Sequence, residues 1–270
     1  LDDNYTGRRE NLAPQDHSPG YRYVNGSAEN KPLALALIKD ADVVFHLASV
    51  VGVKKVMENS VGTINRNIAA SHAVIDGCAA FGRRVVIAST SEVYGASGKE
   101  VFSEEDDSII GQSRHRRWCY AATKLLDEFY AYAHFHASGL PATIVRLFNT
   151  IGPRQVGYYG MVVPNFIECA LNNAPIIVHG DGTQKRCFTA VGDVVQCLME
   201  LSSSPAAIGQ TINIGSSREI SIRELAETIR RLTGSSSPIV PKTYEEIYGE
   251  DFVDMQRRRP DVAKLRSILG

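Results

Sequence analysis

The stretch from Tyr120 to Lys124 holds two side chains that could do chemistry together. Lys124 is the fourth residue after Tyr120, and on a helix this spacing places both side chains on one face. A phenol with a pKa of about 10 is a poor base at neutral pH, but a nearby ammonium group favours its ionised form. The pair could therefore take the proton of an alcohol whose hydride passes to a nicotinamide. An amphipathic helix with a lysine at the surface shows the same spacing, so the pair alone is weak evidence.

A hydroxyl group that could complete this set lies thirty residues before Tyr120. Thr90 ends a continuous apolar run of the sequence. Together Thr90, Tyr120 and Lys124 could polarise a substrate alcohol, remove its proton and leave its hydride to a nicotinamide. A threonine at the end of a strand is also an ordinary structural residue, so only the combination of the three indicates a site.

Three continuous apolar runs could position these residues, at 41–48, 84–90 and 142–148. Such runs are typical of strands that are buried on both faces of a parallel sheet. Helical patterns at about 63–81 and 120–138 separate them. Strands that alternate with long helices predict βαβ units in a doubly wound α/β sheet.

In such a sheet, ligands bind outside the carboxyl ends of the strands. The residues that follow the three runs should therefore be the ones that do chemistry. All of them are small or polar, as a site there requires: Ala48, Ser49, Ser89, Thr90, Ser91, Glu92, Asn149 and Thr150.

The sequence pattern changes after Asn149, where glycine and proline residues predict a loop that includes Tyr158 and Tyr159. Ser221 and Glu224 form a capping box at the start of a later helix. The other elements expected beyond residue 150 are helices at about 163–172, 191–201 and 221–232, strands at 176–178 and 211–214, and a turn at 180–183.

The composition excludes several classes of protein. Of 270 residues, 44% are hydrophobic and 22% are charged, with a net charge of -1. That balance is ordinary for a globular enzyme and gives no reason to expect nucleic-acid or membrane binding. No secretory signal layout is present, and no apolar run approaches the ~20 residues that cross a bilayer. Five cysteines without a C-x-x-C spacing argue against disulfides or a metal site, so we expect a cytoplasmic protein without metal.

Taken together, these motifs resemble the extended short-chain dehydrogenases, a group of NAD-dependent nucleotide-sugar epimerases, dehydratases and decarboxylases. The matching stretches occur in the order and spacing of that family and cover nearly the whole chain. They are residues 1–7, 44–49, 88–95, 120–124, 146–154 and 180–186. The resemblance implies a Rossmann-like fold, a tightly bound NAD and a UDP- or dTDP-sugar substrate.

The resemblance also implies roles for individual residues. Thr90 and Tyr120 would hold the sugar hydroxyl that is oxidised, and Tyr120 and Lys124 would also contact the cofactor. The other residues on the cofactor side would be Asp2 at the adenosine ribose, Leu47, Ala48, Ser49, Asn67 and Ser89. Asn149 and Arg186 would contact the substrate pyrophosphate, and Val163 and Val178 would line the base pocket. Ser91 and Arg258 would also bind the substrate.

The sequence departs from the family pattern at its start. No glycine-rich turn precedes Asp2, so the helix N-terminus that would bind the cofactor pyrophosphate is missing. We therefore expect a Rossmann-like sheet without its first strand, and a fragment that binds NAD poorly and is inactive without the rest of its parent protein. The NAD-binding domain is expected at 1–150 and about 183–216. A smaller C-terminal substrate domain is expected at about 151–182 and 217–270.

The residues after Thr90 indicate which reaction follows oxidation of the sugar. Dehydratases of the family resemble Thr-Asp-Glu, whereas Thr90-Ser91-Glu92 resembles the UDP-glucuronate decarboxylases. Arg258 could bind the substrate carboxylate or supply a proton, and Glu92 could orient the sugar. Both could also be ordinary structural charges. Further stretches that resemble the decarboxylases are 117–120, 185–189, 248–249 and 256–261.

Other functions stay open. A UDP-glucose or UDP-glucuronate 4-epimerase would use Thr90 and Tyr120 without needing Glu92. A catalytically incompetent nucleotide-binding protein is the third hypothesis. Members of the family commonly form homodimers through a four-helix bundle. The apolar residues that could form such a face, or equally belong to the core, are Ala70, Val74, Leu126, Phe129 and Tyr132.

Overall fold

The computed structural model describes the chain except residues 16, 158–159, 249–254 and 256. Parts of two sequence predictions lie outside the described residues. They are the loop residues Tyr158 and Tyr159, and the residues Gly249 and Gln256 of the stretches that resemble decarboxylases. Within the described part of the chain, no helix is both long enough and apolar enough to cross a membrane.

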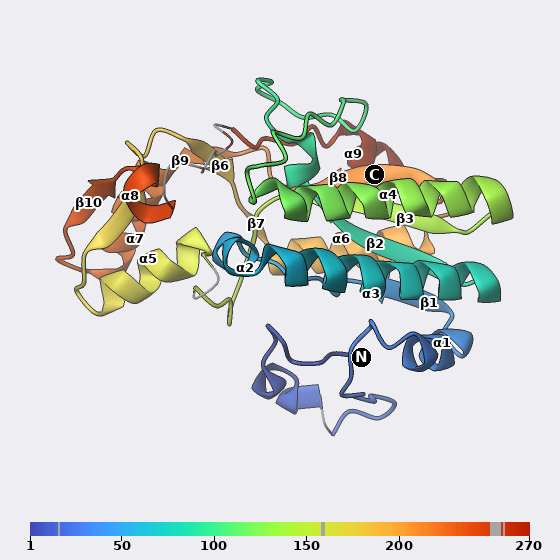
Figure 1. Cartoon of the computed structure of the whole chain (residues 1–270). Helices are drawn as coiled ribbons and strands as arrows, with labels where there is room; N and C mark the ends of the chain where they lie inside the picture. The colour runs from blue at the N-terminus through green and yellow to red at the C-terminus, as the bar shows by residue number, and fades with distance from the viewer. Residues whose placement is uncertain (16, 158–159, 249–254, 256) are drawn as a thin grey trace.

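A parallel sheet of four strands forms the centre of the structure, in the order β1-β2-β3-β8 (Figure 1). The strands are Val43–His46 (β1), Arg84–Thr90 (β2), Ala142–Leu147 (β3) and Gln210–Ile214 (β8). Each predicted strand of this sheet ends within two residues of the observed one. The prediction of an α/β fold with a parallel sheet is confirmed.

Helices cover both faces of this sheet (Figure 1). On one face α3 (Ser60–Phe81) and α4 (Trp118–Ser138) pack side by side, and α1 (Lys31–Lys39) packs against α3. On the other face lie α6 (Val191–Ser203) and α9 (Ala263–Leu269). The sheet is therefore the middle of three layers, as expected for βαβ units.

Burial on both faces explains why the apolar runs are continuous. On β2, Val85 and Ile87 belong to the core under α3, while Val86 between them belongs to the core under α6. Gly82 and Gly139 end α3 and α4 with φ of 61° and 69°, a left-handed conformation that favours glycine. These two turns lead into β2 and β3.

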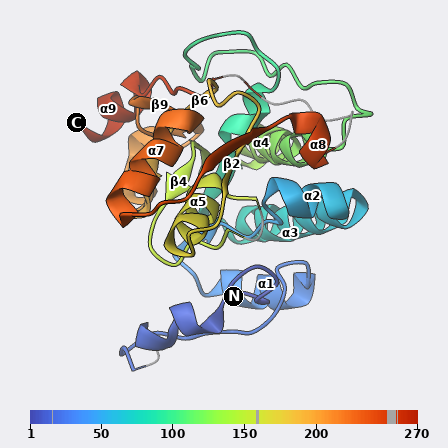
Figure 2. The same ribbon diagram turned by 90° about the vertical axis from the view of Figure 1, so that its left-hand side faces the viewer.

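A smaller group of elements lies to one side of the sheet, at the left of Figure 1 and facing the viewer in Figure 2. Its strand pairs are β5 (Ile176–His179) with β10 (Ile239–Lys242), β6 (Lys185–Cys187) with β9 (Glu219–Ser221), and β4 (Thr150–Ile151) with β7 (Thr189–Ala190). Its helices are α5 (Val162–Leu171), α7 (Ile222–Thr233) and α8 (Tyr244–Tyr248). The predicted capping box of Ser221 and Glu224 is present at the start of α7.

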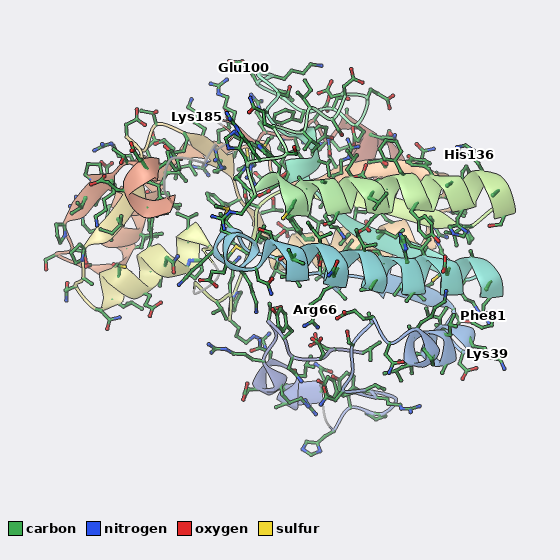
Figure 3. All side chains as sticks on the ribbon, viewed as in Figure 1. Lys39, Arg66, Phe81, Glu100, His136 and Lys185 are labelled. Carbon is green, nitrogen blue, oxygen red and sulfur yellow. The ribbon has the colours of Figure 1, made fainter. Side chains whose placement is uncertain are left out.

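The N-terminal segment runs outside the helical layer of α3, below it in Figures 1 and 2. It contains two short 3-10 helices, Arg9–Asn11 and Ala13–Gln15. Arg66 extends from α3 toward this segment (Figure 3), where its guanidinium pairs with Asp3 and, at 2.9 Å, with Glu29. The ion pairs anchor the segment to α3.

The fold contains helices that the sequence did not predict, and it shows how exposed the residues considered for a dimer face are. The helices α1, α8 and α9, and α2 (Val53–Glu58), are not among those the sequence predicted. Of the residues considered for a dimer face, Ala70 and Val74 are buried on α3. Tyr132 is half-buried, with its hydroxyl 3.0 Å from that of Thr211. The others are exposed, Leu126 by 41% and Phe129 by 66%.

Candidate active site

A cavity of about 1430 Å³ lies at the carboxyl ends of β1, β2 and β3. Its other walls come from the start of α4 and from α5 and β6 of the smaller group of elements. The predicted site residues that line it are Leu47, Ser49, Ser89, Thr90, Ser91, Glu92, Tyr120, Asn149, Val163, Arg186 and Arg258. The predicted site residues that do not line it are Asp2, Ala48, Asn67, Lys124 and Val178.

Thr90 and Tyr120 meet on the wall of this cavity. Thr90 ends β2, and its Oγ1 accepts a hydrogen bond from the amide of Glu92 at 3.2 Å. Tyr120 lies in the first turn of α4 and shares a side-chain hydrogen bond with Thr90. Burial raises the pKa of Tyr120, and the negative charge of Glu92 adds to that effect, while the hydrogen bond with Thr90 acts against it. The sequence predicted this pair of side chains.

Lys124 is buried with 2% exposed, and its Nζ lies 2.9 Å from Oδ2 of Asp127, one helical turn further along α4. Burial, and to a lesser degree the charge of Lys124, lower the pKa of His46 to about 3. The neutral His46 ring lies 3.0 Å from the hydroxyl of Ser71. The expected lowering of the Tyr120 pKa by Lys124 is not observed. Burial dominates at Tyr120, and Asp127 offsets the charge of the ammonium.

A second buried ion pair connects the elements that carry Thr90 and Tyr120. Arg146 on β3 donates to Glu128 on α4 from Nε at 3.1 Å and from Nη2 at 2.8 Å. Ser89, the neighbour of Thr90 on β2, donates its hydroxyl hydrogen to the same carboxylate. The guanidinium also lies 4.7 Å from the centre of the Tyr94 ring. These contacts fix the end of β2 against α4, and so the distance between the two hydroxyl groups of the site.

Glu92 brings two arginines together beside Thr90. The Nη2 atom of Arg258 donates a hydrogen bond to Oε1 of Glu92 at 3.0 Å, and Nη2 of Arg117 lies 3.7 Å from the same oxygen. All three side chains line the cavity, and none is more than 12% exposed. Glu92 and Arg258 are 166 residues apart in sequence, so only the fold places them in contact.

The backbone around Arg258 is held by a loop that follows the 3-10 helix Ser91–Tyr94 (η3). The amide of Phe102 donates to the carbonyl of Arg259 at 2.9 Å, and the amide of Asp261 donates to the carbonyl of Phe102 at 2.8 Å. The buried Asn213 of β8 donates to the carbonyls of Phe102 and Asp261 at 3.0 and 3.2 Å. Arg258 therefore reaches the cavity from a segment that is bonded to the central sheet.

Two of the residues after β1, Leu47 and Ser49, line the cavity at the place where the resemblance predicts a cofactor. The hydroxyl of Ser49 is buried on the cavity wall and has no hydrogen-bond partner among the described residues, which leaves it for a ligand. Leu47 is 54% exposed. Asn67 accepts from the amide of Val50 at 2.7 Å and so supports this loop rather than lining the cavity. Asp2 is exposed and accepts from the amide of Asn4 at 2.7 Å.

Among the residues that the resemblance assigns to the substrate, Arg186 of β6 reaches the cavity and is 7% exposed. Asn149 also lines it, with its amide nitrogen donating to the carbonyl of Cys187 at 3.0 Å. Val178 does not line the cavity but is buried in the core of the smaller group of elements. Because side chains of a strand alternate between its faces, its neighbours Ile177 and His179 line the cavity instead.

Sequence reasoning gave no role to several residues that lie in this site or directly behind it. Arg117 lies within a stretch noted for its resemblance, but its side chain was given no role. Asp127 follows Lys124 by three residues, a spacing that signals a possible partner on one helix face. Val178 was predicted at the base pocket instead of Ile177. Both are β-branched apolar residues, so no local signal shows which of them faces the cavity.

Comparison with known proteins defines the class to which this fold and site belong. Residues 3–215 match the model of the NAD dependent epimerase/dehydratase family. The chain is 42% identical over 233 residues to a UDP-N-acetyl-alpha-D-glucosaminuronate decarboxylase of Bacillus cytotoxicus, covering 86% of this chain and 72% of that protein. It is 33% identical over 270 residues to UDP-glucuronic acid decarboxylase 1 of Xenopus tropicalis, covering 100% of this chain and 61% of that protein.

A solved structure has the same arrangement of elements. The epimerase Mth375 of Methanothermobacter thermautotrophicus superposes with a TM-score of 0.88 at 30% identity, covering 100% of this chain and 77% of that one. The chain belongs to the NAD dependent epimerase/dehydratase family. The two relatives above carry the names of decarboxylases that act on UDP-linked uronic acids, and the chain spans 61% to 72% of their length.

Proposed function

We propose that this protein is an NAD-dependent decarboxylase of a UDP-linked uronic acid, UDP-glucuronate or its 2-acetamido relative. The observation that carries this proposal is the buried Glu92–Arg258 pair beside Thr90 and Tyr120. An epimerase that acts on a neutral sugar has no use for buried charges at that place, because burying them is costly. The names of the two relatives support the same reaction.

In this proposal Thr90 and Tyr120 hold the hydroxyl group on C4 of the sugar, and Tyr120 accepts its proton. NAD, when bound, would take the C4 hydride and later return it. The 4-ketone makes the sugar a β-keto acid, which loses carbon dioxide readily. The C5–C6 bond then breaks, its electron pair moves toward the C4 oxygen, and C5 takes up a proton. Arg258 is placed to stabilise the developing negative charge, with Glu92 fixing its guanidinium at 3.0 Å.

The nucleotide would lie on the side of the cavity formed by α5 and β6. Arg186 has a planar fork that suits phosphate oxygens, and its burial limits competition from water. Val163 and Ile177 present apolar surface on which a base can pack. Uridine and thymidine both fit this description, so UDP- and dTDP-sugars are both to be tried.

Two other functions compete with decarboxylation. A UDP-sugar 4-epimerase would use Thr90 and Tyr120 and return the hydride to the other face of the ketone. Its support is that the solved structure with a TM-score of 0.88 carries the name of an epimerase. A protein that binds nucleotide sugars without turning them over is the third candidate, and the buried site described above gives it no specific support.

The experiment is to incubate the full-length protein with NAD and UDP-glucuronate and to follow the sugar by NMR. We expect loss of carbon dioxide and a UDP-linked pentose or 4-keto-pentose. The same run with UDP-N-acetylglucosaminuronate decides which uronate is preferred. Conversion to UDP-galacturonate with the carboxylate retained would instead identify an epimerase. Binding of the sugar without any conversion would favour the non-catalytic function.

We also propose that the protein forms a homodimer through the outer surfaces of α3 and α4. Large apolar side chains are exposed there, namely Val61 by 70%, Leu126 by 41% and Phe129 by 66%. Exposed apolar side chains that form a contiguous patch mark contact surfaces between proteins, whereas isolated ones do not. Phe129→Glu should convert a dimer to a monomer in sedimentation. An unchanged molar mass would contradict this proposal.

A further inference from the structure

A polar residue is buried in the middle of β8, the last strand of the central sheet. Asn213 is 0% exposed, and its neighbours Ile212 and Ile214 belong to the apolar core under α6. A buried amide costs free energy unless its donors and acceptor are bonded, and an apolar residue would suit this strand without that cost. Asn213 does not line the cavity, so its polarity does not serve a ligand directly. The groups that it bonds must explain it.

Both polar atoms of the Asn213 side chain are bonded. Its Oδ1 accepts a hydrogen bond from the hydroxyl of Tyr94 at 2.7 Å. Its Nδ2 donates to the carbonyls of Phe102 and Asp261 at 3.0 and 3.2 Å. Its backbone amide also donates to Oε1 of Glu104 at 2.7 Å. One residue of β8 therefore joins three segments that are far apart in the sequence.

Two of these segments carry the buried ion pair of Glu92 and Arg258. Tyr94 is the last residue of η3 and follows Glu92 by two residues. Asp261 follows Arg258 by three residues. The third segment connects them, because the ring of Tyr94 stacks on that of Phe102 with centroids 4.9 Å apart. The amide of Asn213 thus fixes the backbone on both sides of the ion pair.

Different contacts hold the other half of the site. The hydrogen bonds of Glu128 described above fix the end of β2, with Thr90, against Tyr120 on α4. The hydrogen bonds of the Asn213 side chain go to the segments of the ion pair instead. A change at Asn213 should therefore move the ion pair and leave the two hydroxyl groups in place.

We propose that Asn213 is a positioning residue, which sets the place of the Glu92–Arg258 pair in the cavity and so the rate at which carbon dioxide is lost. This inference rests on the proposed function, because it takes the pair as the groups that act on the 4-keto uronate. Oxidation at C4 depends on Thr90 and Tyr120 and should not change with Asn213. A reacting group that is misplaced by about 1 Å slows its step by about 100-fold.

Two variants of the full-length protein test this role. Asn213→Asp keeps the shape of the side chain, but replaces the amino group that donates to two carbonyls by an oxygen. Tyr94→Phe removes one hydroxyl, keeps the ring on Phe102 and is the milder change. Thr211→Val is the matched control on the same strand. It is 5% exposed and loses a hydroxyl that lies 3.0 Å from that of Tyr132.

The first measurement is turnover of UDP-glucuronate with NAD. Release of carbon dioxide should fall in kcat by about 10- to 100-fold for Asn213→Asp, and by less for Tyr94→Phe, with little change in KM. In a quenched single turnover, both variants should accumulate the C4-oxidised uronate, whereas the wild type and Thr211→Val should not. A loss of folded protein would slow both steps equally and accumulate none.

The second measurement is amide hydrogen exchange without substrate, followed by mass spectrometry. Residues 100–104 and 258–262 should exchange faster in Asn213→Asp than in Thr211→Val, because the bonds that hold these two segments to β8 are lost. Exchange in β2 and β3 should stay as in the wild type.

The outcomes separate this inference from the proposed function. Asn213 does not position the pair if exchange in the two segments is unchanged, or if oxidation at C4 and loss of carbon dioxide fall by the same factor. If Asn213→Asp does not fold, Tyr94→Phe decides by the same turnover criteria. A wild-type protein that releases no carbon dioxide would refute the proposed function, while faster exchange in both segments of Asn213→Asp would still support the role of Asn213 in holding them.

Discussion

The buried pair of Lys124 and Asp127 is expected to set the pH at which Tyr120 acts as a base. The two side chains are 2.9 Å apart and 2% and 1% exposed. Burial is the largest cause of the raised pKa of Tyr120, and the negative charges of Glu92 and Asp127 add to it. Asp127 follows Tyr120 by seven residues on α4, which places both on one helix face about 10.5 Å apart along the axis.

Asp127→Asn removes this charge and keeps the shape of the side chain. A unit charge at about 10.5 Å contributes about 1.6 kcal/mol at an effective dielectric constant of about 20. That energy corresponds to about 1.2 pH units. Since a negative charge opposes ionisation of a phenol, its removal lowers the pKa of Tyr120. The low-pH limb of the kcat profile should therefore move to lower pH by about one unit.

The assay is the pH profile of NAD-dependent turnover of the UDP-linked uronate, with thermal unfolding measured on the same samples. Asp107→Asn removes a carboxylate from an exposed position and should leave the profile in place. A limb that stays in place for Asp127→Asn, or moves to higher pH, would refute the electrostatic argument. A lower unfolding temperature with an unchanged profile would show that Asp127 serves stability alone.

Two further predictions concern buried groups behind the site. Glu128→Gln leaves the guanidinium of Arg146 buried without its counter-ion. In denaturant titration this substitution should lower the free energy of unfolding by about 3–5 kcal/mol. The control Glu227→Gln, at an exposed position, should change it little. Burial, helped by Lys124, lowers the pKa of His46 in the folded state from 6.5 to about 3. The free energy of unfolding should therefore fall as the pH drops from 6.5 toward 3, by about 2 kcal/mol at pH 5, because the unfolded chain binds a proton that buried His46 does not. His46→Gln should remove this pH dependence, whereas His136→Gln, at an exposed position, should keep it.

The residues that face the cavity were predictable because they follow strand ends. The run at 84–90 is continuous and β-branched, and the strand β2 has the same bounds. In a parallel sheet the carboxyl ends of neighbouring strands share one edge. Ser49, Thr90 and Asn149 could therefore be grouped from sequence alone, and all of them line one cavity.

Some missed elements carried a local signal and others did not. Asn30 caps α1 and Pro32 lies in its first turn, and both are ordinary signs of a helix start. The helix α2, in contrast, follows Gly52, which has a φ of 101°. It lies in a stretch rich in valine, a composition typical of a strand. The two- and three-residue strands of β4, β6, β7 and β9 depend on partners far away in sequence, so no local pattern predicts them.

The partners of buried charges were the hardest part to predict. Asp127 and Glu128 are adjacent acidic residues of a helix, a pattern that usually marks a solvated face. Both are buried, because Lys124 meets one and Arg146 meets the other. Arg146 comes from β3 and lies 18 residues from Glu128, so the pair exists only once the strand has packed against α4. Without that contact, neither carboxylate could be placed in the interior.

The buried charges of the site fall into two groups that differ in how they are bonded. Away from the cavity wall, Lys124 with Asp127 and Arg146 with Glu128 form one-to-one pairs at 2.9 and 2.8 Å, which suits a structural role that must not change during a reaction. On the wall, Arg117 and Arg258 approach a single oxygen of Glu92 at 3.7 and 3.0 Å. Two guanidinium groups around one carboxylate leave a net positive charge on the cavity wall, which favours an anionic ligand. The pairs behind the wall are neutral, and breaking either of them would leave a buried charge without its counter-ion.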